Sequence, residues 1–140
     1  MAIKENFMQK PNKKKKVFLG GTCNNSLWRE KLMPLLTIDY FNPVVENWTE
    51  EAKHQEIEER KNADYCLYVL TNKMEGIYSI AEVVDDSNKR PEKTIYCYID
   101  FDGTFEPHTT KGLKATGEMI AANGATWCKN LEEVVQVLNQ

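Results

Sequence analysis

The chain has 140 residues, of which 41% are hydrophobic and 28% are charged, and its formal net charge is −3 at pH 7. This length suits one domain with a single hydrophobic core, and the composition excludes general disorder. The slightly acidic balance provides no basic field for a nucleic acid, and no run approaches the roughly eighteen apolar residues that a membrane-spanning helix needs.

Residues 1–15 are polar and rich in lysine toward their end. They predict a flexible basic leader in front of a single domain over residues 16–140. For the lysine run 13–16 we favour a solvated tail over a contact with phosphate or nucleic acid. The leader lacks the apolar segment that a secretory signal carries, so we expect a cytoplasmic protein.

The cysteines are widely spaced and match no zinc site. Three of them fall in predicted strands, so we expect buried, reduced thiols at Cys23, Cys66, Cys97 and Cys128. Neither of the two histidines has a partner at ligand spacing. The sequence therefore predicts no metal and no cofactor.

The first predicted unit is a strand followed by a helix. The apolar run 16–21 ends in two glycines, as a buried strand that enters a turn does. Residues 24–36 follow with helical spacing, and Pro34 should end or kink that helix. The residues available to cap its N-terminus are Asn24, Asn25 and Ser26.

The middle of the chain repeats this alternation. Residues 38–44 predict a second strand, and residues 49–63 predict a helix capped by Thr49. The nearly continuous apolar run 64–71 is typical of a strand covered on both faces. A third helix is expected over residues 79–87.

The last part completes five strand–helix units. Strands are predicted over 94–99 and 125–129, and helices over 110–124 and 130–140. The pattern predicts an α/β fold, a three-layer doubly wound parallel sheet of flavodoxin-like or Rossmann-like type, with strand order 2-1-3-4-5. In such a sheet ligands bind at the carboxyl ends of the strands, so the loops after strands one and three are the expected site, with the loop after strand two at its rim.

The stretch "IDFDGTFE" after the fourth strand resembles the DxDGT motif of haloacid-dehalogenase-type phosphatases. That chemistry needs further phosphate-binding and acidic residues on later strands, and only 40 residues follow Asp100. Asp, Gly and Thr are also common turn formers. We therefore expect Asp100 and Asp102 to belong to a structural loop.

Three segments resemble the nucleoside 2-deoxyribosyltransferase family, in particular its small bacterial and phage-type branch. They are "KVFLGGTCNNSLWRE", "YFNPVVENWTEEAKHQEIEERKNADYCLYVLT" and "MEGIYSIAEVVDDS", and the resemblance covers residues 16–100. It implies that Glu82 is the catalytic nucleophile and that Glu56 handles the base or its proton. Glu58 or Glu59 could take that register instead, and a further loop acid would fall on Glu75.

The chemistry of an N-glycosidic bond suits these assignments. Its cleavage develops positive charge at C1′, which an ionised carboxylate stabilises and attacks, and the departing base needs a proton from a second acid. A structural role is the alternative for Glu82, because residues Ser79 to Glu82 match the S-x-x-E pattern of a capping box. Ser79 could instead bind a sugar hydroxyl or a 5′-phosphate near the helix N-terminus.

The remaining predicted substrate-binding residues come from the loops after the strands. Amides and hydroxyls can read the edge of a base, and indoles can stack on it, although capping and core packing are the structural alternatives. These residues are Gly21, Thr22, Asn24, Asn25, Trp28, Trp48 and Gly76.

We therefore expect an enzyme that exchanges the base of a nucleoside or deoxynucleoside. The alternatives are hydrolysis of a nucleoside monophosphate or of NAD, and a module that binds a nucleotide signal without turnover. The expected partners are a nucleoside or nucleotide and a free nucleobase, with no nucleic acid and no membrane. The resemblance also implies a homo-oligomer with Trp48 near the subunit contact.

Overall fold

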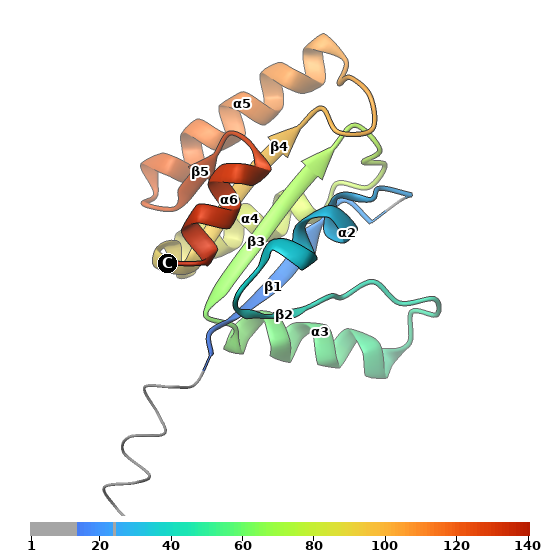
Figure 1. Ribbon diagram of the computed structural model, residues 1–140. Coiled ribbons are helices and arrows are strands. Elements are labelled where there is room, and N and C mark those ends of the chain that lie inside the picture. The colour runs from blue at the N-terminus through green and yellow to red at the C-terminus, as the bar shows by residue number, and fades with distance from the viewer. Residues whose placement is uncertain (1–13, 24) are drawn as a thin grey trace, which may run out of the picture.

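The computed structural model describes residues 14–23 and 25–140. Most of the expected basic leader and the predicted contact residue Asn24 lie outside these described residues. The domain is a five-stranded parallel sheet in the order β2-β1-β3-β4-β5, which confirms the predicted topology (Figure 1). The strands are β1 (Lys16–Gly21), β2 (Asp39–Phe41), β3 (Tyr65–Thr71), β4 (Thr94–Ile99) and β5 (Thr126–Cys128).

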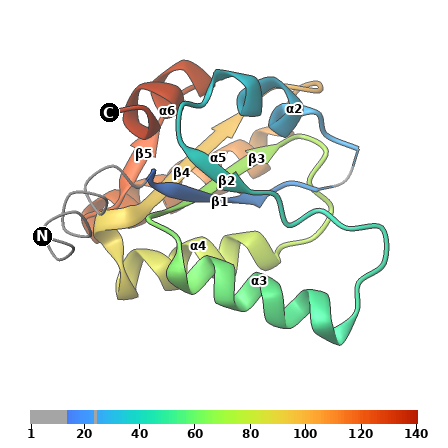
Figure 2. The same cartoon turned by 60° about the horizontal axis from the view of Figure 1, so that its bottom comes forward.

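Helices cover both faces of this sheet, so the three-layer prediction is also confirmed. Figure 2 shows α2 and α6 on one side and α3 and α4 on the other. The helices are α2 (Trp28–Leu32), α3 (Glu50–Asn62), α4 (Tyr78–Lys89), α5 (Pro107–Ala122) and α6 (Leu131–Leu138), with short 3₁₀ turns at Met33–Leu35 and Pro91–Lys93. None of the helices in the described ranges combines the length and apolarity needed to cross a membrane.

The sheet separates two hydrophobic cores. One lies beneath α2 and α6 and includes Trp28 and Val134, and the other lies beneath α4 and α5 and includes Tyr68 and Ile120. The central strand β3 serves both cores, because its successive side chains point to opposite faces and nearly all of them are buried. This burial on both faces is what the continuous apolar run indicated.

The first helix differs from its prediction. It is α-helical only over Trp28–Leu32, and Pro34 converts its continuation into a 3₁₀ turn. The expected polar cap is absent, because Leu27 occupies the cap position without a side-chain hydrogen bond. The Ser26 hydroxyl instead donates to Asp102 Oδ2 at 2.6 Å, and Asn25 adopts a left-handed φ of 49° in the loop.

The boundaries of other elements also shift. The second strand has only three residues instead of the predicted 38–44, because Asn42 and Pro43 follow it directly and proline has no N–H for the ladder. The fourth predicted helix begins earlier, at Pro107, a residue favoured in the first helical turn. The Thr49 cap is confirmed, since its Oγ1 accepts from Ala52 N at 3.0 Å.

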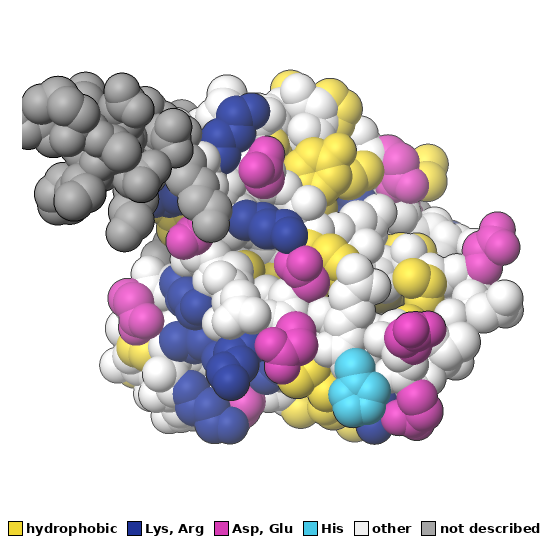
Figure 3. Space-filling view, turned by 90° about the horizontal axis from the view of Figure 1, so that it is seen from below, with side chains coloured by type: hydrophobic (Ala, Val, Ile, Leu, Met, Phe, Trp, Pro, Cys, Tyr) yellow, Lys and Arg dark blue, Asp and Glu magenta, His cyan; other side chains and the backbone are white. Residues whose placement is uncertain are grey.

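The helix α3 is the least buried of the α-helices described above. None of its residues is fully buried, and it is attached through polar contacts such as the 2.8 Å ion pair of Lys16 with Glu59. Seen from the side on which α3 lies, basic and acidic side chains cover much of the surface, with hydrophobic side chains between them (Figure 3). Polar contacts therefore form part of the attachment of this helix to the domain.

Candidate active site

A cavity of about 250 Å³ opens at the carboxyl edge of the sheet, where β1 ends beside α4. The loop between β2 and α3 forms one wall, and α3 and α4 form another. Among the residues proposed from the sequence, this cavity is lined by Gly21, Trp48, Glu56, Ser79 and Glu82. It lies where the strand order reverses, which is where ligands bind in such sheets.

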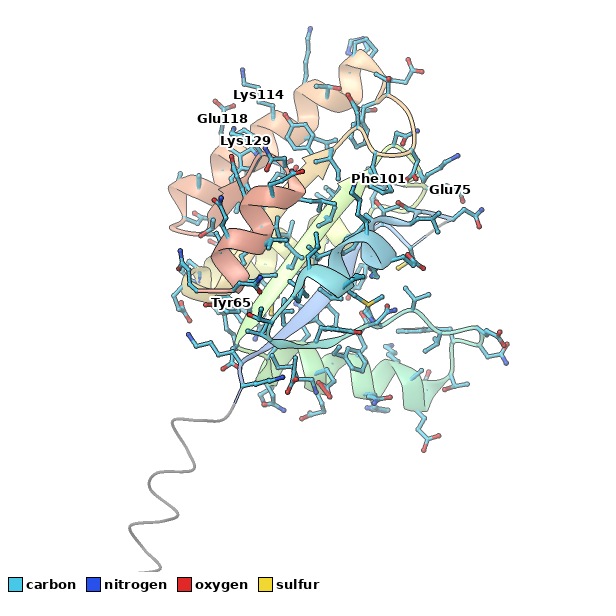
Figure 4. The ribbon with its side chains drawn as sticks, viewed as in Figure 1. Tyr65, Glu75, Phe101, Lys114, Glu118 and Lys129 are labelled. Atoms are coloured by element: carbon cyan, nitrogen blue, oxygen red, sulfur yellow. The ribbon has the colours of Figure 1, made fainter. Side chains whose placement is uncertain are left out.

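A smaller hollow of about 170 Å³ adjoins it and shares Gly21, Cys23 and Ser79 with it. This second hollow lies beside the loop after β3, and two further predicted residues, Thr22 and Gly76, line it. Glu75, which projects from the same loop (Figure 4), is part of its wall and does not line the larger cavity.

Glu82 is buried in the second turn of α4, with only 8% of its surface exposed. The capping-box interpretation is wrong, because α4 begins at Tyr78 after Ile77 and no side chain caps it. Glu82 Oε2 instead accepts a hydrogen bond from Arg60 Nη1 at 3.3 Å. Within residues 14–23 and 25–140, no protein group donates a hydrogen bond to Oε1.

Burial raises the pKa of Glu82 to about 7, since a carboxylate loses hydration inside the protein. The positive charge of Arg60 opposes this rise, whereas the negative charges of Glu56 and Asp86 add to it. Glu82 therefore changes its ionisation near neutral pH, which is typical of residues in functional sites.

Glu56 faces the same cavity from the middle of α3 and is half-buried. Burial raises its pKa, while Arg60 and Arg29 act in the opposite direction. The two alternative positions point elsewhere, because Glu58 accepts from Asn62 Nδ2 and Glu59 pairs with Lys16. Of these three glutamates, Glu56 alone lines the cavity.

Arg29 is a cavity residue that the sequence did not reveal. Its buried guanidinium donates from Nη1 to the carbonyl of Thr22 at 2.7 Å and from Nε to the carbonyl of Leu19 at 3.0 Å. No carboxylate among the described residues lies within ion-pair distance of it. Burial lowers its pKa, and among the described residues that line the cavity Arg29 is the one with a cationic side chain.

Trp28 cannot stack on a substrate, which corrects one prediction. Its side chain is fully buried against the sheet, and its indole N–H donates to the carbonyl of Thr22 at 2.9 Å. Asn25 is exposed and lines neither hollow. Trp48 differs from both, because it lies on the cavity wall with 59% of its surface exposed.

Asp100 and Asp102 support the loop after β4. Asp102 Oδ2 accepts from the hydroxyls of Ser26 at 2.6 Å and Thr71 at 3.2 Å, and Asp100 Oδ1 accepts from Phe105 N at 3.2 Å. Neither aspartate lines the cavity that contains Glu82. In the described ranges, no group of three or more His, Cys, Asp or Glu side chains could hold a metal ion.

A model of the family described as nucleoside 2-deoxyribosyltransferase like matches residues 14–101. The chain belongs to this family. The match runs from the start of the sheet to the end of β4, so it includes the cavity, Glu56 and Glu82. Membership indicates an enzyme whose substrates are nucleosides. No curated protein matches the chain significantly.

Proposed function

We propose that the protein transfers the sugar of a nucleoside or deoxynucleoside between bases through a covalent ester on Glu82. The observation that carries this proposal is the shared cavity, in which a buried carboxylate with a free oxygen faces a second acid, Glu56. The exposed indole of Trp48, on the wall formed by the loop between β2 and α3, supplies a flat surface on which a base can stack.

In the first step, Glu82 Oε1 attacks C1′ of the sugar. The C1′–O bond forms while the C1′–N bond breaks, and its electron pair goes to the base nitrogen. Glu56 in its protonated form donates the proton that the leaving base needs, and its raised pKa favours that form. In the second step an incoming base attacks C1′, its proton returns to Glu56, and the Glu82 carboxylate departs. Two displacements retain the configuration at C1′.

Hydrolysis is the alternative outcome of the same ester, with water in place of the second base. The cavity wall favours it, because Val44, Val45 and Trp48 are 47%, 48% and 59% exposed and do not seal the site from solvent. Nucleoside monophosphates and NAD are the candidate substrates for this reaction.

We also propose that a second copy of the chain covers these apolar side chains in a homo-oligomer. Tyr40 and Ile57 extend the exposed apolar surface around the loop between β2 and α3. A copy placed there would exclude water from the ester and favour transfer. Light scattering at micromolar concentration tests this, and a monomer that transfers sugar efficiently would contradict it.

The decisive experiment incubates the protein with a deoxynucleoside and a different free base and follows the products by chromatography. A new nucleoside indicates transfer, and free sugar indicates hydrolysis. Mass spectrometry after reaction with a slow 2-fluoro nucleoside should place the sugar on Glu82. Activity should rise with pH through about 7, as Glu82 ionises. Full activity in Glu82→Ala would overturn the assignment.

A further inference from the structure

Arg60 connects the helix that carries Glu56 to the helix that carries Glu82. It lies in the last turn of α3, and each nitrogen of its guanidinium has an acidic partner on α4. Nε and Nη2 contact the two oxygens of Asp86 at 3.2 and 3.1 Å, which fixes the plane of the group. Nη1 then reaches Glu82 Oε2 at 3.3 Å, and Nη2 also contacts Asp85 at 3.3 Å.

Asp86 holds Arg60 in this orientation and is itself held on its other sides. It is fully buried, and it accepts from the Tyr68 hydroxyl at 2.6 Å and from Arg90 Nε at 2.8 Å. Burial alone would raise the pKa of Asp86, but hydrogen bonds from Arg60, Tyr68 and Arg90 lower it below its ordinary value. Asp86 therefore stays ionised and provides a fixed anchor for Arg60.

We propose that Arg60 is a positioning residue for Glu82, which holds Oε2 and leaves Oε1 directed to the reacting carbon. The proposal rests on the proposed function only in naming Glu82 as the nucleophile. When Oε1 bonds to C1′, Oε2 becomes the carbonyl oxygen of the ester, and Arg60 continues to donate to it. When the ester breaks, the same N–H stabilises the carboxylate that departs.

The charges around Glu82 determine what the loss of Arg60 would do. Glu56 and Arg60 face it from α3, Asp86 lies one turn further along α4, and Arg29 and Glu46 line the same cavity. The phenol of Tyr68 faces the same cluster from β3. Removing Arg60 deletes this positive charge beside Glu82, while the negative charges of Glu56 and Asp86 remain and Asp86 keeps Arg90 as its ion-pair partner. The pKa of Glu82 should then rise above its value of about 7.

Carbon-13 NMR of glutamate-labelled protein measures this directly and needs no substrate. The side-chain carboxyl resonance that disappears in Glu82→Gln identifies Glu82. We expect its titration midpoint to rise by about one pH unit or more in Arg60→Gln, the shift typical of losing an adjacent opposite charge. Arg90→Gln is the matched control, since Arg90 contacts Asp86 and has no contact with Glu82. Its effect on the midpoint should be clearly smaller.

Kinetics then separate positioning from charge. In Arg60→Gln the acidic limb of kcat/KM should move to higher pH with the midpoint, so that part of the activity returns on raising the pH. Arg60→Lys keeps the charge, but a single amine cannot hold Asp86 and Glu82 in one plane. Arg60→Lys should keep the acidic limb of kcat/KM near its original pH. It should lower kcat about tenfold with little change in KM.

An unchanged midpoint in Arg60→Gln, or an equal shift in Arg90→Gln, would overturn the proposal. If Arg60→Gln fails to fold, Arg60→Lys decides, and an unchanged kcat in that variant would overturn it. These outcomes differ from failure of the proposed function, which would appear as full activity in Glu82→Ala while the Glu82 titration still depended on Arg60.

Discussion

Replacing Glu82 with glutamine should stabilise the protein at neutral and alkaline pH while it abolishes turnover. Glutamine has nearly the same shape as glutamate and carries no charge, so the substitution removes the cost of a buried carboxylate. Strain or poor solvation stored in an active site is commonly released in this way. The expected gain depends on pH, which makes the prediction specific.

The sign and size follow from the pKa of Glu82, which rises from an ordinary value of 4.5 to about 7 on folding. Below pH 4.5 the group is protonated in both states and contributes no difference. As pH rises from 4.5 to 7, the unfolded chain loses its proton first, so the wild-type protein loses stability across this window. At 1.36 kcal/mol per pH unit, the loss above pH 7 amounts to about 3 kcal/mol.

Urea denaturation of wild type and Glu82→Gln at several pH values measures this difference. The variant should be more stable by about 3 kcal/mol at pH 8 and by less than about 0.5 kcal/mol at pH 4.5. Glu118→Gln is a control, because it makes the same chemical change at a glutamate that is exposed on α5 (Figure 4). A variant that is less stable than wild type at pH 8, or a difference that does not change with pH, would refute the reasoning.

Three further predictions concern the cavity and the loop after β4. Glu56→Gln should slow transfer, because glutamine cannot donate the proton that the leaving base needs; a wild-type rate of transfer in the folded variant would count against the assignment. Trp48→Ala should raise KM several-fold, which steady-state kinetics measure. Because the indole is exposed, the same substitution should change the free energy of unfolding by less than about 0.5 kcal/mol, which a thermal melt measures. Asp100→Asn and Asp102→Asn should keep activity within a few-fold of wild type, and a chelator should have no effect. Loss of activity in a folded Asp100→Asn protein, or phosphate release from an aryl phosphate, would instead support the phosphatase interpretation.

The sequence by itself determined the order of elements, the sheet topology and the edge at which the cavity opens. The strand predicted over 94–99 coincides with β4, and the continuous apolar run 64–71 matches β3 to within one residue. These features are local, because burial on both faces of a parallel strand leaves an uninterrupted apolar run, and the order of strands along a doubly wound sheet places their carboxyl ends at one edge. Together with the family resemblance, that was enough to bring Glu56 and Glu82 to one site.

Only the tertiary structure decided what surrounds these glutamates. The S-x-x-E spacing at Ser79 is a local signal for a cap, yet the cap position of α4 is Ile77, two residues earlier. Glu82 contacts Arg60 instead, which lies 22 positions away in sequence. The Tyr68 hydroxyl on β3 and the Asp86 carboxylate on α4 are also brought together by the fold. The core neighbours of Trp28 likewise come from other elements. The spacing of apolar residues along the chain indicates which face of a helix or strand is buried. The partner of a buried charge depends instead on how separate helices pack against each other. The electrostatics of the cavity therefore arise from the fold.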